Sequence, residues 1–202
     1  PGDTLIACGF ASYLGVFTRD FRKEAIDNFA DFLKKSNVPI CEHADPLSIL
    51  TTEAEMASWA TQGLPSDRVS MENGAIMNAS ARWSLMIDPQ LQGIVFVKNS
   101  AGTEDNPLNI TRMGHSKMVH TFEMCIEHGK SIMIENMGEN VDAVLQPIIS
   151  RTKIQRGSRQ FIKLGDKEIV YNKGFKLYLQ TKLSNPHYPP EIQAETTLIN
   201  FT

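Results

Sequence analysis

Apolar residues recur at three- and four-residue steps through the first third of the chain, a spacing typical of amphipathic helices. They form two series: Phe10, Tyr13, Leu14, Phe17 and Phe21, followed by Ile26, Phe29, Phe32 and Leu33. Gly15 and Thr18 lie between the two series and predict a break between two helices rather than one long helix. We expect these helices to pack on their own domain, although a stripe of this kind can also bind a partner.

Two shorter helices are expected before residue 80. Thr52 and Glu55 form a capping box, in which each side chain accepts a hydrogen bond from the backbone N–H of the other residue. The helix that they start would end near Gly63, and residues 69–77 would form the second helix after a short loop. We therefore interpret residues 1–80 as an N-terminal helical segment.

From Trp83 onward, short apolar runs replace the helical stripes. The expected strands are residues 84–88, 109–113, 131–135, 175–181 and 196–201. The expected helices between them are residues 93–99, 118–129 and 142–149. Residues 160–171 alternate in polarity around Gly165-Asp166, which predicts a β-hairpin insert. This alternation favours an α/β core at residues 81–202, a sheet of about five mostly parallel strands with helices on both faces in three layers.

Composition and charge exclude several classes of protein. The 202 residues are 42% hydrophobic and 21% charged, as in ordinary globular proteins, and are enough for a single domain. The net charge is −3 and no block of five like charges occurs, so a nucleic-acid or anionic-membrane surface is disfavoured. Apolar runs are far shorter than the roughly 20 residues of a membrane span.

The cysteines predict neither a disulfide framework nor a metal site. Cys8, Cys41 and Cys125 are odd in number and widely spaced, which fits a reducing compartment such as the cytoplasm. Cys41 and His43 form one C-x-H pair, but no second pair with zinc-like spacing accompanies them. The chain begins at Pro1 and stops in a strand-like run, so we expect it to be a fragment of a much larger chain.

The segment after the first expected strand has the place of a phosphate loop without its chemistry. In an open α/β sheet, ligands lie beyond the carboxyl ends of the strands. A phosphate loop needs glycines whose N–H groups approach the phosphates, a lysine, and a hydroxyl for magnesium. This loop offers one glycine and neither of the others, and its carboxylate would repel a triphosphate. Its residues are Asp88, Pro89, Gln90, Leu91, Gln92 and Gly93.

Glu135 follows another apolar strand, in the position of the acid in a Walker B segment. There a carboxylate holds magnesium or orients the attacking water. The alternative is a strand-end carboxylate that caps the next turn. Asn136 follows where a second acid would help, and an amide cannot act as a base. Both features predict the outline of a nucleotide pocket without its working groups, and no catalytic residue is assigned.

Together these motifs resemble, in order and over essentially the whole chain, the large α/β subdomain of the fifth AAA+ module of dynein heavy chains. The similar blocks are residues 3–7 with 13–15, 63–67, 72–74, 83–90, 135–139, 164–168, 181–188 and 198–202. The sequence Asn185-Pro186-His187-Tyr188 is more similar to axonemal than to cytoplasmic dyneins. The resemblance implies a P-loop NTPase-like fold and identifies Thr181 as a sensor-like residue.

Two departures from the family pattern concern ATP. Leu91 stands at a position where the family's loop often has glycine, and Gly93 stands where it has alanine. Glu195 stands at a neighbour-facing position where some dyneins carry a basic residue that reaches the nucleotide of the fourth module. These departures put in doubt both nucleotide binding by this module and its help to the adjacent ATPase.

The resemblance implies a structural, coupling module of an ATP-driven microtubule motor, itself unable to hydrolyse ATP. No cofactor is expected in this module, with ATP and magnesium bound by other modules. The expected partners are the neighbouring AAA+ modules and, through the stalk of the parent chain, the microtubule, in the cytoskeleton of a ciliary or flagellar axoneme. One alternative is a module that retains regulatory ATP or ADP binding. Another, independent of the resemblance, is a small-molecule enzyme that uses Asp88 and Glu135 across a strand-end crevice.

Overall fold

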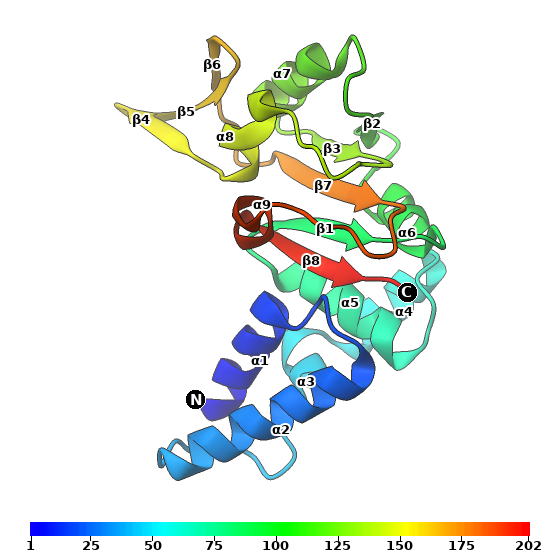
Figure 1. Cartoon of the computed structure of the whole chain (residues 1–202), viewed down its shortest axis with the longest axis vertical. Coiled ribbons are helices and arrows are strands. Elements are labelled where there is room, and N and C mark those ends of the chain that lie inside the picture. The colour runs from blue at the N-terminus through cyan, green and yellow to red at the C-terminus, as the bar shows by residue number, and fades with distance from the viewer.

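A five-stranded parallel sheet forms the centre of the computed structural model, which describes all residues 1–202 (Figure 1). Neighbouring strands run in the order β2-β3-β7-β1-β8, so β1 lies between β7 and β8. At the carboxyl end of β1, Ile87 is in register with Thr181 on one side and Asn200 on the other. The strands are β1 (Trp83–Ile87), β2 (Asn109–Thr111), β3 (Ser131–Ile134), β7 (Lys176–Thr181) and β8 (Thr196–Asn200).

Helices cover both faces of this sheet, as predicted, because successive strand residues point to opposite sides. Leu85 belongs to one buried cluster and Met86 to the other. The Leu85 face packs on α7 (Met118–His128), η1 (Ala143–Leu145), α8 (Gln146–Ile149) and α9 (Pro190–Glu195). The Met86 face packs on α1 (Gly2–Tyr13), α3 (Pro46–Leu50), α4 (Glu53–Thr61), α5 (Arg68–Ala79) and α6 (Gln92–Ser100). None of the helices combines the length and hydropathy needed to cross a bilayer.

The predicted hairpin is present, and a third strand extends it. β5 (Arg159–Leu164) and β6 (Lys167–Val170) are antiparallel, and β4 (Lys153–Arg156) pairs with β5 on the other side. The sequence did not predict β4, because its residues are mostly polar and exposed and show no apolar alternation. The short helices α3 and α9 were also not predicted, since each is too brief to show a helical period.

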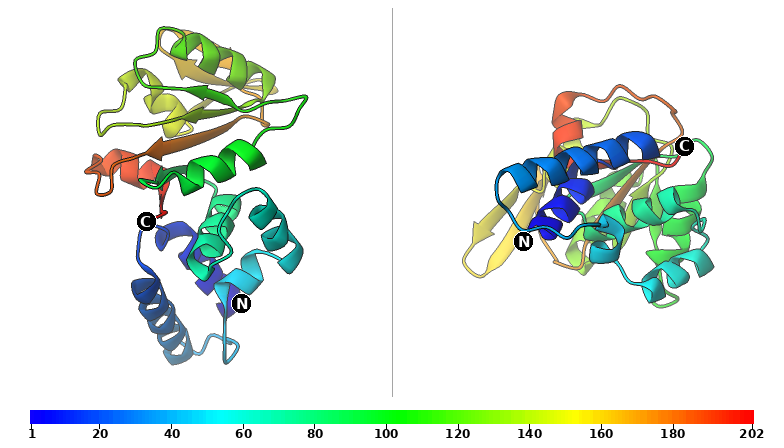
Figure 2. Two further views of the ribbon diagram at one scale, coloured as in Figure 1. Left: turned by 90° about the vertical axis from the view of Figure 1, so that its right-hand side faces the viewer. Right: turned by 90° about the horizontal axis from the view of Figure 1, so that it is seen from below.

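The predicted break between the first two helices is confirmed. α1 ends at Tyr13 and α2 (Arg19–Lys35) begins six residues later. The expected packing of both stripes on their own domain is only partly correct, because α2 buries just Arg22 and Leu33. Figure 2 shows α2 at one end of the molecule, away from the five-stranded sheet. Tyr13 and Phe32 are the most exposed members of the stripes, at 69% and 68%.

The buried guanidinium of Arg22 fixes the connection between α1 and α2. Arg22 is only 1% exposed, and burial lowers its pKa while its bond to Glu72 opposes this effect. It donates to the carbonyls of Leu14, Gly15 and Phe17 at 2.8–3.1 Å and to the side chains of Glu72 at 3.2 Å and Asn73 at 2.7 Å. Burial of an arginine is tolerated only when all of its donors are satisfied in this way.

The same cluster reaches the edge strand of the sheet. The Asn73 side chain donates to the Asn200 carbonyl at 2.7 Å, and the Asn200 N–H donates to the Gly15 carbonyl at 2.9 Å. A Cβ atom at Gly15 would lie 2.5 Å from the Leu198 carbonyl oxygen, so this close approach requires glycine. Arg22 therefore ties α2, α5 and β8 together.

We predict that Arg22→Ala lowers the free energy of unfolding by about 3–5 kcal/mol, because it leaves the buried Leu14 and Gly15 carbonyls without their donor and leaves a cavity in place of a buried side chain. Urea denaturation followed by circular dichroism measures the change. The matched control is Arg19→Ala on the exposed surface of the same helix, which should change stability by less than about 0.5 kcal/mol. Equal losses in the two variants would contradict the assigned role of Arg22.

Candidate functional site

In the loop between β1 and α6, a carboxylate of the loop itself occupies backbone N–H groups at the start of α6. Asp88 is 0% exposed, and its two oxygens accept hydrogen bonds from the backbone N–H groups of Gln92 and Ile94, both at 2.8 Å. Free N–H groups at a helix start are the groups that bind a phosphate in phosphate loops. Here a fixed side chain of this protein takes two of them, and its negative charge is favourable at the positive end of the helix.

Leu91 and Gly93 each occupy a backbone position that favours glycine. Leu91 adopts a left-handed conformation with φ 63°, which glycine adopts without strain and leucine does not. Its side chain is 37% exposed, so neither it nor the exposed Gln90 fills the start of α6. A Cβ at Gly93 would lie 3.0 Å from the Met86 sulfur and 3.2 Å from the Phe201 ring, so glycine lets α6 pack closely on the sheet.

Gln180 connects this loop with the segment after β3. Its side-chain amide donates to the Asp88 carbonyl at 3.3 Å and accepts from the Asn136 N–H at 2.8 Å. It is fully buried, which makes the two hydrogen bonds costly to lose. The sequence did not single out Gln180, because the block that resembles the dynein family begins at the next residue, Thr181. An amide directly after the apolar run Leu177-Tyr178-Leu179 was the available signal.

The Thr181 side chain is buried and bonds to the turn that follows β7. Its carbonyl accepts from the Asp88 N–H at 2.9 Å, and its hydroxyl accepts from the Leu183 N–H at 3.1 Å. It therefore contacts the phosphate-loop segment through its backbone. Asn136 takes a left-handed conformation with φ 52°, which asparagine tolerates better than most residues, and thereby turns the chain away from β3.

Glu135 is held by two cations. Arg112, just after β2, donates to its carboxylate at 2.7 and 2.9 Å, and the Lys98 ammonium of α6 lies 3.7 Å from its other oxygen. The Glu135 side chain is 17% exposed whereas that of Arg112 is 67% exposed, so the pair lies at the surface of the molecule. Neither cation was identified from the sequence, because their positions beside Glu135 depend on sheet order. The interpretation of Glu135 as a simple turn cap is not supported.

Glu195 lies at the opposite end of the sheet from the Asp88 loop. It is the last residue of α9, directly before β8, and accepts a hydrogen bond from the Gln146 side chain at 2.7 Å. Because this end holds the amino ends of the strands, the structure does not bring Glu195 together with Asp88, Glu135 and Thr181. Its role toward a neighbouring module remains a prediction.

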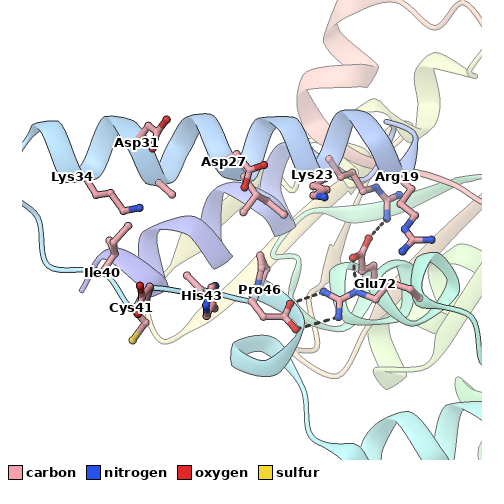
Figure 3. A pocket seen from close by; sticks show the side chains of 17 residues that line it. Arg19, Lys23, Asp27, Asp31, Lys34, Ile40, Cys41, His43, Pro46 and Glu72 are labelled. Carbon is pink, nitrogen blue, oxygen red and sulfur yellow. Dashed lines mark hydrogen bonds and ion pairs between the residues drawn. The ribbon is translucent and has the colours of Figure 1, made fainter.

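The main hollows of the molecule lie away from the Asp88 loop. One groove of about 750 Å³ runs between α2 and residues 40–46, with side chains of both charges. Figure 3 shows this groove, in which Arg68 bonds Asp45 and Glu72, and Glu72 also bonds Arg22. A cavity of about 430 Å³ lies between α4, α5 and the amino ends of β1 and β7. Neither has residues 88–93 in its lining.

Of the three cysteines, Cys125 is buried and Cys8 and Cys41 are exposed. Burial raises the pKa of the Cys125 thiol to about 11, which keeps it protonated and unreactive. No group of three His, Cys, Asp or Glu side chains is arranged to hold a metal ion.

The fold and the site define a class of protein. A parallel sheet in the order β2-β3-β7-β1-β8, with a loop and helix after β1 and an acid after β3, is consistent with an AAA+-type α/β module. The family model described as the ATP-binding dynein motor region matches residues 57–202, and the chain belongs to this family.

Several curated dynein chains are similar to this one over its whole length. It is 54% identical to the dynein alpha chain of the flagellar outer arm of Chlamydomonas reinhardtii and 49% identical to the ciliary dynein beta chain of Heliocidaris crassispina. It is 45% identical to dynein axonemal heavy chain 9 of Homo sapiens. The alignments cover all of this chain but only 4% of each relative.

We predict that Asp88→Asn lowers the free energy of unfolding by roughly 1–2 kcal/mol, because an amide offers one acceptor oxygen and no charge to the two N–H groups of α6. Thermal unfolding of the 202-residue chain measures the effect. Asp105→Asn, at an exposed loop position, is the matched control and should change stability by less than about 0.5 kcal/mol. An unchanged stability of the Asp88 variant would contradict the capping role.

Proposed function

We propose that this chain is a structural, coupling module of an axonemal dynein heavy-chain motor ring and that it does not itself hydrolyse ATP. The family match and the similarity to flagellar and ciliary dyneins support its place in such a motor. The order of the sequence blocks supports the fifth position in the ring. On this proposal its partners are the adjacent AAA+ modules, it acts on microtubules only through the parent chain, and it is located in the axoneme.

The bonding of Asp88 carries the proposal. A triphosphate would have to displace a buried carboxylate from the N–H groups of Gln92 and Ile94 and then lie beside its negative charge. Like charges in a poorly hydrated site repel strongly. The loop also has no lysine to compensate, so nucleotide binding would cost free energy at the step where a phosphate loop normally gains it.

The surroundings of Glu135 support the same conclusion. A Walker B carboxylate must be free to hold magnesium or to orient water. Here the Glu135 carboxylate is instead paired with Arg112 and lies near Lys98, two cations of the protein itself. Together with the Gln180 hydrogen bonds, these contacts join β1, β2, β3, β7 and α6 in one set of bonds. Such a set can transmit force between neighbouring modules without nucleotide turnover.

We predict that the 202-residue chain shows no binding of ATP, with or without magnesium, in isothermal titration calorimetry. The reason is that its own carboxylate occupies the phosphate-binding N–H groups. Titration of magnesium chloride alone is the control for heat that arises from the metal. Magnesium-dependent binding of ATP with a micromolar Kd would overturn the proposal.

The alternative is regulatory nucleotide binding, in which Glu135 still acts on a bound nucleotide. The left-handed conformation of Leu91, at a position where the family's loop often has glycine, is the observation that favours this alternative. We predict that Glu135→Gln leaves ATP turnover of the intact heavy chain unchanged, because its carboxylate is already paired with Arg112. Steady-state ATPase measurement on assembled motors tests this prediction. The matched control is Glu127→Gln on the exposed surface of α7, and slowed turnover in the Glu135 variant alone would favour the alternative.

The hypothesis of a small-molecule enzyme has no support in the geometry. Asp88 is fully buried and both of its oxygens are already bonded within the protein. Glu135 is bound by two cations. Neither carboxylate is therefore free to accept a proton from a substrate.

A further inference from the structure

The three-stranded insert concentrates positive charge. Residues 151–176 hold eight of the 20 basic residues and two of the 23 acidic ones, a net charge of +6 in a chain whose total is −3. The basic residues are two to six positions apart, so no continuous run marks them in the sequence. In Figure 1 the strands β4 and β5 project from the end of the sheet opposite the Asp88 loop.

The outer face of this insert carries an apolar row. Ile154 is in register with Phe161, and Phe161 is in register with Val170, so the three side chains lie side by side across three strands. The other face of the insert packs into the core through Ile162, Leu164 and Ile169. Ile154 and Phe161 are half-buried, Val170 is 38% exposed, and all three lie outside both core clusters.

Basic side chains flank the row without enough acids to balance them. Arg156 and Arg159 are a directly opposed cross-strand pair, an arrangement that destabilises a sheet when nothing separates the charges. Arg156 bonds Glu168 at 2.8 Å, whereas Arg159 and Lys163 are exposed and form no ion pair. Two unpaired basic side chains, Arg159 and Lys163, therefore lie on the same face as a partly exposed apolar row.

We propose that this outer face, formed by Ile154, Phe161, Val170, Arg156, Arg159 and Lys163, binds an acidic amphipathic segment of a partner protein. Apolar side chains of the segment would cover the row, and its carboxylates would pair with Arg159 and Lys163. The repulsion between Arg156 and Arg159 would then be relieved on binding. This inference does not rest on the proposed function of the Asp88 loop.

Two features favour a protein over a nucleic acid or a membrane. Phe161 is the one aromatic residue of the row, whereas non-specific binding of single strands uses several stacking platforms. The apolar row has the width of three strands, which suits a few side chains of a bound segment.

The proposal can be tested on the 202-residue chain by fluorescence anisotropy. The probe is a labelled synthetic peptide in which Glu alternates with Leu and Phe. We expect this peptide to bind about tenfold more tightly than polyglutamate of the same charge, because burial of the apolar row adds to charge pairing. Arg159→Glu combined with Lys163→Glu should weaken binding at least tenfold, and Phe161→Ser should remove the advantage over polyglutamate.

The matched control combines Arg19→Glu with Lys34→Glu, the same change of charge on the exposed surface of α2 at the other end of the molecule. It should leave binding unchanged, and thermal unfolding should show that every variant is folded. The proposal would be overturned if both peptides bound equally well or if neither bound. It would also be overturned if single-stranded RNA or phosphatidylserine vesicles bound more tightly than the peptide. Self-association through this face, seen by analytical ultracentrifugation and lost in the Arg159 and Lys163 variant, would overturn it too.

Discussion

The carboxylate of Asp88 at the start of α6 is the interaction on which the candidate site depends. It satisfies two N–H groups that would otherwise be buried without partners, and the backbone of the same residue is bonded to Thr181 and Gln180. One residue thus fixes the end of β1, the start of α6 and the end of β7. A phosphate loop keeps these groups free for a ligand, whereas this loop uses them for its own stability. The difference supports the proposal that this AAA+-type module does not hydrolyse ATP.

Arg22 plays a comparable part for the N-terminal helices. It is buried among backbone carbonyls and joins the α1–α2 connection to α5, and Asn73 continues the contact to β8. Both clusters place a charged group in the interior and surround it with hydrogen-bond partners, which gives directional contacts that apolar packing cannot give. The exposed aromatic residues of α1 and α2 are consistent with a piece of a longer protein, since the chain spans 4% of its relatives.

Much of the fold follows from the sequence because its signals are local. The capping box of Thr52 and Glu55, the strand of residues 84–88 and the hairpin at Gly165 depend on neighbours within a few positions, and the structure confirms all three. The polar strand β4 gave no such signal, because its place is set by pairing with β5. The burial of Arg22 also contradicts any pattern rule, since an arginine on an amphipathic helix is expected on the solvent side.

For the site, the sequence by itself determined which groups are missing: no lysine, no hydroxyl and a single glycine after the first strand. It also placed Glu135 after a buried strand. Only the tertiary structure decided what replaces those groups, namely the Asp88 carboxylate at the α6 amides, the Gln180 bridge, and the cations of Arg112 and Lys98 beside Glu135. The physical reason is that absence of a residue type is a property of the chain alone. A hydrogen bond between residues 92 positions apart, such as that of Gln180 with Asp88, exists only when the order of the strands brings them together.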